Sequence, residues 1–251
     1  MEERNELIPP KRNPALLHHN LRSAGEALAP HLAHYRDDPN ALVLALVRGG
    51  VPAALEVSKK LRLKTDVVLV RKLLAPQGPN RPICAATVAG NLVIDTRLPE
   101  LESRSEPGLK FFLADAIQSL KQRTGLCRGD SPFVNVAGKT ILLIDNGART
   151  GATIRAAVNA IRQLRPARIV VAIPMGAPEC RSLLEENSDE LVCLAWHDPF
   201  GHVGMWYSKY DVPQIEQIRG MMEAVAAETS EPDHSTRKRL TVHDPAPHEH
   251  G

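Results

Sequence analysis

The stretch TILLIDNGARTGAT, residues 140–153, contains four consecutive apolar residues, then an acidic residue, and then a loop rich in glycine and threonine. A short apolar run of this kind is typical of a buried strand, and the spacing of residues 151–164 predicts a helix directly after it. A strand that passes through a short loop into a helix is the unit from which parallel α/β sheets are built. The stretch therefore decides the fold class and shows where to look for a ligand.

The loop between this strand and this helix is suited to a sugar phosphate. Backbone N–H groups at a helix N-terminus have no partner inside the helix and carry partial positive charge. Gly151 lets a phosphate approach them, and the hydroxyls of Thr150 and Thr153 add uncharged donors. Asp145 would repel a phosphate, so it is better suited to sugar hydroxyls or a metal-bound water. The alternative is a plain strand-to-helix turn in which Thr150 or Thr153 caps the helix.

The rest of the chain repeats this alternation of strands and helices. Strands are expected at residues 41–46, 66–70, 140–144, 168–174 and 190–196, with a hairpin at 83–95. Helices are expected at residues 21–34, 51–61, 109–123, 151–164, 178–187 and 213–227. Continuous Val, Ile and Leu strands separated by helices predict an α/β fold, with a mostly parallel central sheet and helices on both faces. In such sheets ligands bind beyond the carboxyl ends of the strands.

Composition narrows the class of protein further. The 251 residues suffice for one large α/β domain with extensions, and we expect a flexible segment at 1–19, the domain at 20–226 and a disordered tail at 227–251. The net charge of +2 does not indicate nucleic-acid binding. No apolar run approaches the roughly 20 residues of a membrane span, so we expect no membrane contact. No signal-peptide core is visible, which makes the cytoplasm the expected location.

Two basic blocks follow other predicted strands. Arg48, Gly49 and Gly50 come directly after the strand at 41–46, where glycines expose backbone N–H groups and arginine offers a fork to phosphate oxygens. Arg71 and Lys72 end the next strand on the same edge of the sheet. The alternatives are a tight turn with a surface arginine and an exposed strand end, and strand alternation points only one of Arg71 and Lys72 into a site.

These blocks together resemble the type I phosphoribosyltransferases. ILLIDNGARTGAT (141–153) is similar to the family's motif for 5-phosphoribosyl diphosphate (PRPP): an apolar strand, two acidic residues, three variable residues and T-G-x-T. LVLALVRGGVPAALEVSKKL (42–61) resembles the pyrophosphate loop with its helix, and DVVLVRKLLAPQGP (66–79) resembles the next strand. DPFGHVGMWYSKYD (198–211) looks like the hood, expected at about 192–211. CRGDSP (127–132) is similar to a segment of a bacterial group of uncharacterised phosphoribosyltransferases.

The resemblance covers residues 21–218 and implies the family's fold and reaction. The implied fold is a type I phosphoribosyltransferase domain with a small hood, and a homodimer is a common form of it. The implied reaction transfers the phosphoribosyl group of PRPP to a nitrogenous acceptor and releases diphosphate with Mg²⁺, which PRPP carries and which would lie near Asp145. The implied catalytic positions are Asp145 and Asn146. The implied substrate-binding positions are Arg48, Gly49, Gly50, Arg71, Lys72, Gly147, Ala148, Arg149, Thr150, Gly151, Ala152, Thr153 and Phe200.

The sequence departs from the family pattern at two informative positions. Asn146 stands at the second acidic position, where it keeps a carbonyl acceptor but loses the charge. A charge-assisted hydrogen bond is about twice as strong as a neutral one, so PRPP contacts there should be weaker. Arg149 stands where enzymes acting on 6-oxopurines usually carry an aspartate, which argues against hypoxanthine or guanine as acceptor. The alternative function is a catalytically weak or inactive module of the same fold that binds PRPP or a nucleotide and regulates.

Overall fold

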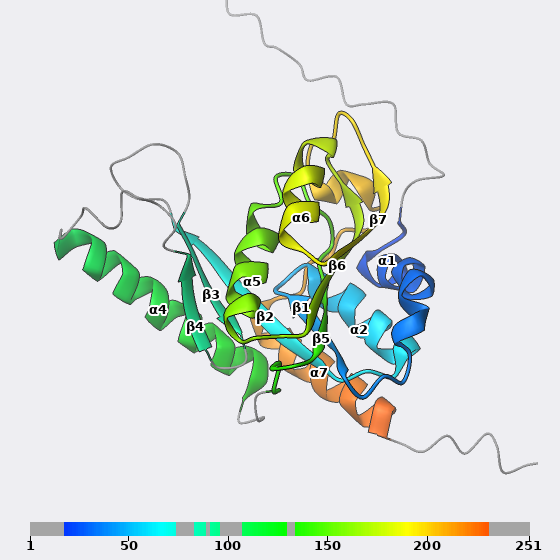
Figure 1. The fold of residues 1–251 in the computed structure, drawn as a ribbon, viewed down its shortest axis with the longest axis horizontal. Coiled ribbons are helices and arrows are strands. Elements are labelled where there is room, and N and C mark those ends of the chain that lie inside the picture. The colour runs from blue at the N-terminus through cyan, green and yellow to red at the C-terminus, as the bar shows by residue number, and fades with distance from the viewer. Residues whose placement is uncertain (1–17, 74–82, 89–90, 96–106, 130–133, 231–251) are drawn as a thin grey trace, which may run out of the picture.

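The computed structural model describes residues 18–73, 83–88, 91–95, 107–129 and 134–230. At its centre is a seven-stranded sheet with the strand order β4-β3-β2-β1-β5-β6-β7 (Figure 1). The strands are β1 (Ala41–Leu46), β2 (Thr65–Leu73), β3 (Ile83–Val88), β4 (Asn91–Asp95), β5 (Thr140–Ile144), β6 (Arg168–Gly176) and β7 (Glu190–Trp196). From β2 to β7 neighbouring strands are parallel, whereas β3 and β4 form an antiparallel hairpin. The predicted α/β fold is therefore confirmed.

Helices cover both faces of this sheet (Figure 1). The α-helices are α1 (Leu21–Leu28), α2 (Gly50–Leu61), α4 (Pro107–Arg128), α5 (Ala152–Gln163), α6 (Arg181–Asn187) and α7 (Ile215–Ser230). Short 3-10 helices are η2 (Ala29–Tyr35), η3 (Pro178–Cys180) and η4 (Val203–Trp206). Within the described ranges, no helix has both the length and the apolar character of a membrane span.

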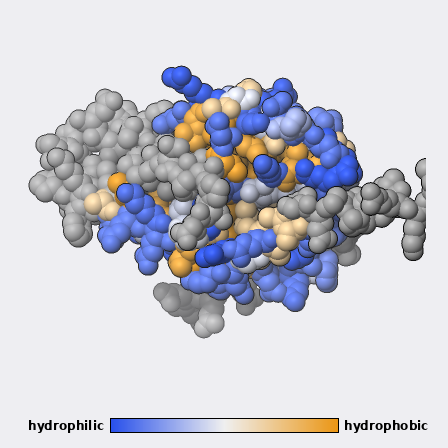
Figure 2. All heavy atoms as spheres, turned by 90° about the horizontal axis from the view of Figure 1, so that it is seen from below, coloured by the Kyte–Doolittle hydropathy of each residue, from blue (hydrophilic) through white to orange (hydrophobic). Residues whose placement is uncertain are grey.

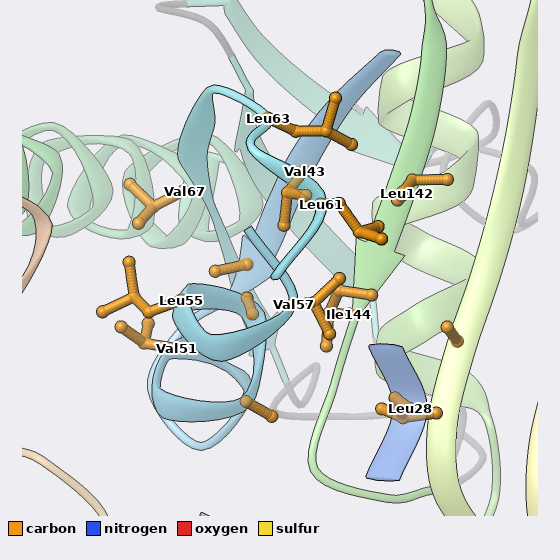
Figure 3. Close-up of a cluster of buried hydrophobic side chains, with 14 of the residues drawn as sticks. Leu28, Val43, Val51, Leu55, Val57, Leu61, Leu63, Val67, Leu142 and Ile144 are labelled. Atoms are coloured by element: carbon orange, nitrogen blue, oxygen red, sulfur yellow. The ribbon is translucent and has the colours of Figure 1, made fainter. Parts of the chain in front are cut away.

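The strands divide their side chains between two separate cores. Val43, Leu142 and Ile144 face a cluster built with α1, α2, α4 and α7 (Figure 3). Leu44 and Leu143, one position away along the same strands, face a second cluster built with α5 and α6. Because successive strand residues point to opposite faces, a strand covered on both faces must be apolar throughout. All six residues of β1 are buried, which explains the uninterrupted ALVLAL sequence.

Among the coloured residues in the view of Figure 2, polar and charged side chains are the most numerous, and apolar side chains show between them. This is the ordinary surface of a domain whose apolar strands are enclosed by helices. Many of the apolar side chains therefore lie between the sheet and the helices that cover it.

Several predicted elements differ in extent from the structure, and two of these differences have a clear cause. The helix predicted at residues 21–34 is α-helical only as far as Leu28 and continues as a 3-10 helix. Pro30 lies at the start of that 3-10 helix, and proline cannot donate the i to i−4 hydrogen bond of a continuing α-helix. Strand β2 extends to Leu73 because β3 pairs with it in antiparallel register. Arg71 and Lys72 therefore lie within β2 and not at its end, which corrects the sequence-based placement.

A buried ion pair fixes the start of β2 to the end of α4. The Asp66 carboxylate pairs with the Arg128 guanidinium, and both side chains are almost fully buried. One oxygen of Asp66 also accepts a hydrogen bond from the backbone N–H of Val67 (2.7 Å), and the other accepts one from Val134 (3.4 Å). Arg128 belongs to the CRGDSP segment, of which residues 130–132 lie outside the described ranges. The ion pair thus connects α4 to β2, and Asp66 also contacts the segment that begins at Val134.

A third apolar cluster lies under the segment after β7, residues 197–214, which is called the hood segment below. It joins Phe200, Trp206 and Tyr207 to α1 and to the end of β6. The His197 ring is buried there and stacks on Trp206, with ring centroids 3.7 Å apart. His18 forms an isolated parallel bridge with Tyr207, so the first described residues also hold the hood segment.

The Asp66–Arg128 pair should contribute far more to stability than a surface pair. Asp66→Asn removes the charge that compensates a buried guanidinium, so we expect the free energy of unfolding to fall by about 3 kcal/mol. Glu185→Gln, which makes the same change in the exposed pair with Arg181, should cost less than about 1 kcal/mol. Urea unfolding measures both values. Equal losses in the two variants would contradict this assignment.

The buried histidine should make stability depend on pH. Burial lowers the pKa of His197, so the folded protein rejects a proton that the unfolded chain binds below about pH 6.5. The free energy of unfolding should therefore fall as the pH drops below that value. His18 adds to this effect because burial and the nearby His197 lower its pKa. His197→Phe, which keeps a flat ring against Trp206, should show a shallower fall between about pH 6.5 and pH 5 in urea unfolding. Indistinguishable slopes in variant and wild type would contradict this.

Candidate functional site

The predicted motif loop lies at the carboxyl end of β5 and lines one hollow. This hollow has a volume of about 190 Å³. Its walls are Asp145, Gly147, Ala148, Arg149, Thr150, Gly151, Ala152, Thr153, Ile154 and Val203. The structure therefore brings together eight of the positions singled out from the sequence and adds Ile154 and a residue of the hood segment. A small hollow bounded by a helix N-terminus and one carboxylate has the size and chemistry of an anion pocket beside a hydroxyl acceptor.

Two glycines shape this loop. Gly147 has a φ of 141° and Gly151 a φ of 68°, both in the region that side chains rarely adopt. Gly151 is the N-cap of α5, so the threonine cap considered from the sequence is wrong. Thr150 Oγ1 is only in long contact, at 3.5 Å, with the N–H of Ala152. The N-cap Gly151 makes no side-chain hydrogen bond to the helix, and the first residues of α5 line the hollow.

Asp145 is half-buried where β5 ends. Its Oδ1 accepts a hydrogen bond from the backbone N–H of Asn146 at 2.8 Å, which fixes the carboxylate at the wall of the hollow. A carboxylate accepts hydrogen bonds through both of its oxygens. The carboxylate therefore has the position expected for binding hydroxyl groups.

Asn146 is buried and is held by two tyrosines of the hood segment. Its Nδ2 donates a hydrogen bond to Tyr210 Oη (2.8 Å), and its backbone carbonyl oxygen accepts one from Tyr207 Oη (2.7 Å). Its side chain does not line the hollow described above. The sequence predicted Asn146 as a catalytic position, and the structure gives it a clear structural role between motif and hood. Sequence reasoning missed Tyr210, whose only signal was its place in an aromatic-rich segment.

The predicted pyrophosphate loop packs directly on the end of β5. A Cβ added to Gly50 would lie 2.5 Å from the Ile144 carbonyl oxygen, and one added to Gly49 would lie 2.4 Å from Asn146 Nδ2. The glycines are therefore required by close approach of two loops, beyond any exposure of N–H groups. The Arg48 side chain is exposed, and its Nη1 donates to Gln214 Oε1 at 3.1 Å. The peptide bond between Val47 and Arg48 is cis.

The remaining predicted positions lie elsewhere. Arg71 forms an ion pair with Asp115 of α4, with 3.3 Å between Nη2 and Oδ2. The side chain of Lys72 lies outside the described residues. Phe200 has only 5% of its surface exposed and belongs to the apolar cluster under the hood segment. Its ring packs against other side chains, and the substrate-binding role that the resemblance implies for Phe200 stays a prediction. Trp206 and Tyr207 belong to the same cluster.

The described residues hold no group of three or more His, Cys, Asp or Glu side chains that could bind a metal ion. Asp145 is the carboxylate at the hollow. Mg²⁺ in proteins is commonly held by one or two carboxylates together with substrate phosphates. The residues present therefore fit a Mg²⁺ ion that arrives with a diphosphate, near Asp145.

Comparison with known proteins finds two named sequence relatives and a similar solved structure. Two proteins of Mycobacterium tuberculosis, from strains CDC 1551 and H37Rv and both named "putative phosphoribosyl transferase", are 28% identical over 200 residues. The match covers 80% of this chain but 45% of each relative, so the chain spans less than half of their length. The crystal structure of the protein TT1426 from Thermus thermophilus is 31% identical, with a TM-score of 0.69. The match covers 82% of this chain and 97% of that protein.

The family match is broader than the motif loop. Residues 17–208 match the family described as phosphoribosyl transferase domain. The matched range includes the sheet, both glycine-containing loops and most of the hood segment. The fold, the arrangement of these loops and the relatives agree, and the chain belongs to the phosphoribosyl transferase domain family.

Proposed function

We propose that the protein binds PRPP and transfers its phosphoribosyl group to a nitrogenous acceptor, with release of diphosphate. The observation that carries the proposal is the hollow at residues 145–153, which combines a helix N-terminus with the Asp145 carboxylate. The pyrophosphate loop lies against this motif, since Gly50 packs on Ile144 and Asp145. Family membership supports transfer chemistry of this class.

In this proposal the 5-phosphate binds at the start of α5. The backbone N–H groups of residues 150–153 would donate to phosphate oxygens, helped by the partial positive charge of the helix N-terminus. Thr150 and Thr153 would add hydroxyl donors. Asp145 would accept hydrogen bonds from the ribose hydroxyls, because a carboxylate is an acceptor with no donor of its own. The phosphate would thus lie at the partial positive charge of the helix N-terminus, and the ribose at the negative charge of Asp145.

The diphosphate would lie at residues 48–50. The Arg48 guanidinium is exposed and can turn to the ligand as a fork for phosphate oxygens. Asp145 would help to hold a Mg²⁺ ion that arrives with the diphosphate, and this ion would neutralise charge on the leaving group. In the reaction the bond between ribose C1 and the diphosphate oxygen breaks, and an acceptor nitrogen forms the new bond to C1. The described residues contribute by positioning and charge, without a covalent nucleophile.

Arg149 bears on the choice of acceptor. Its exposed side chain lines the hollow beside Thr150. A guanidinium stays protonated and cannot accept a hydrogen bond. Arg149 therefore cannot take a proton from the substrate, as an acidic residue at this position could. We therefore propose an acceptor other than a 6-oxopurine.

A second candidate function is a PRPP-binding module with little or no turnover. The observation that favours it is the engagement of Asn146 by Tyr207 and Tyr210, at the position where the family pattern has a second acid. Diphosphate release, measured with Mg²⁺-PRPP across a panel of nitrogenous bases, separates the two functions. Turnover with any base supports the transferase, and binding without turnover supports the module.

The first prediction from this proposal concerns the phosphate end. Thr150→Val removes one hydroxyl donor without changing the shape of the side chain. A hydrogen bond to a charged group contributes about 1.5–3 kcal/mol, so affinity for Mg²⁺-PRPP should fall at least tenfold in calorimetric titration. Thr140→Val, at the other end of β5, should bind like the wild type. No binding at millimolar Mg²⁺-PRPP by the folded wild type would overturn the proposal.

The second prediction concerns the missing acid. Asn146→Asp places a second carboxylate at a site that is 7% exposed and next to Asp145, so its pKa should be raised above that of the unfolded chain. The folded variant then holds a proton that the unfolded chain releases, and stability is lost as the pH rises. We expect the variant to be less stable than wild type by about 1–3 kcal/mol at pH 8 and by less at pH 5. Urea unfolding at both pH values measures this. A variant as stable as wild type at the higher pH would contradict it.

A further inference from the structure

One segment of the hood contacts both ligand-binding loops of the proposed site. Residues 207–214, called the tether below, reach the motif through Tyr207 and Tyr210 and reach the pyrophosphate loop through Pro213 and Gln214. We propose that the tether sets the separation of these two loops, and that Tyr210 is the positioning residue through which it acts. This inference rests on the proposed function, in which one ligand spans both loops.

At the motif, the tether holds one residue from two sides. Tyr207 Oη donates to the backbone carbonyl of Asn146, and Tyr210 Oη accepts from the side-chain amide of the same residue. Tyr207 is buried in the hood cluster, so it anchors the tether to the domain. The Tyr210 ring packs on Gly204, where an added Cβ would lie 2.9 Å from Cδ1. The packing on Gly204 therefore helps to orient the phenol toward Asn146.

At the pyrophosphate loop, the tether holds the arginine that the proposal assigns to the diphosphate. Arg48 Nη1 donates to Gln214 Oε1 at 3.1 Å and lies 3.4 Å from the Pro213 carbonyl oxygen. The backbone of Gly49, the next residue, lies on the Asn146 amide. Asn146 thus contacts the pyrophosphate loop on one side and the tether on another. Loss of the Tyr210 hydroxyl would free the amide on which Gly49 packs.

The charges around Tyr210 agree with this central position. Burial raises the pKa of the Tyr210 phenol and Asp145 raises it further, while the hydrogen bond from Asn146 and the charge of Arg48 act in the opposite direction. The phenol therefore lies within electrostatic range of one charged group from each loop. It stays neutral near pH 7 and can accept the amide hydrogen of Asn146.

A separation between two half-sites matters only to a ligand that occupies both. Mg²⁺-PRPP carries a 5-phosphate and a diphosphate on one ribose, so its affinity depends on how the two loops are spaced. Ribose 5-phosphate uses only the motif, and diphosphate without a metal ion uses only the pyrophosphate loop. A positioning residue should therefore affect the first ligand and spare the other two.

The experiment compares Tyr210→Phe with the wild type by calorimetric titration of Mg²⁺-PRPP, of ribose 5-phosphate and of diphosphate without a metal ion. Tyr210→Phe should weaken Mg²⁺-PRPP about tenfold, the effect of one lost hydrogen bond, and change the other two affinities less than about twofold. The matched control is Tyr35→Phe, which removes a phenol hydroxyl bound to Glu190 at 2.9 Å, at the opposite end of β7. It should leave all three affinities unchanged.

Unchanged Mg²⁺-PRPP affinity in Tyr210→Phe overturns the inference. An equal loss of affinity for ribose 5-phosphate also overturns it, because that result would indicate only local damage to the motif. Failure of the proposed function is seen separately, as a folded wild type that binds none of the three ligands. Hydrogen–deuterium exchange without ligand then decides the inference. Tyr210→Phe should speed exchange at both residues 47–50 and 145–153 relative to Tyr35→Phe. Faster exchange in neither loop, or in one alone, contradicts a tether that joins them.

Discussion

The site depends on the close contact between two loops at the ends of adjacent strands. β1 and β5 are parallel neighbours, with Ala45 opposite Ile144, so the chain leaves both strands at the same edge. Gly50 then lies against the Ile144 carbonyl oxygen and Gly49 against the Asn146 amide, at distances that a side chain could not occupy. Because the strands are apolar and buried on both faces, they cannot shift to relieve this contact. The sheet thus fixes the two strand ends from which the loops start.

This contact explains why several residues have the types they do. Asn146 lies between the pyrophosphate loop and two phenols, in a buried position beside Asp145. A neutral amide can donate to Tyr210 there, whereas a second carboxylate would lose solvation and be repelled by Asp145. The neutral side chain at position 146 is therefore linked to the packing of the hood segment. Asn146 takes part in hydrogen bonds to this segment through its side-chain amide and its backbone carbonyl.

Much of the fold was predictable because it depends on local patterns of apolar and polar residues. The continuous apolar strands and the amphipathic helices indicated the parallel sheet and its two covered faces, and the hairpin at β3 and β4 followed from its turn residues. The hollow at residues 145–153 was also predictable, since the loop forms it from one continuous stretch. Contacts between residues far apart in the sequence were not predictable. Asn146 and Tyr210 are 64 positions apart, and neither residue type indicates that the other will bind it. The surroundings of Phe200 and Arg71 were not predictable for the same reason, because packing under the hood segment and pairing with α4 decide them.

The most direct measurement is a crystal structure of the protein with bound Mg²⁺-PRPP. The account predicts the 5-phosphate on the backbone N–H groups of residues 150–153, the ribose hydroxyls at Asp145 and the diphosphate at residues 48–50. It also predicts that Asn146 keeps its hydrogen bonds to Tyr207 and Tyr210 in the complex. Ligand bound at another place, or a hollow without phosphate at saturating Mg²⁺-PRPP, would contradict it.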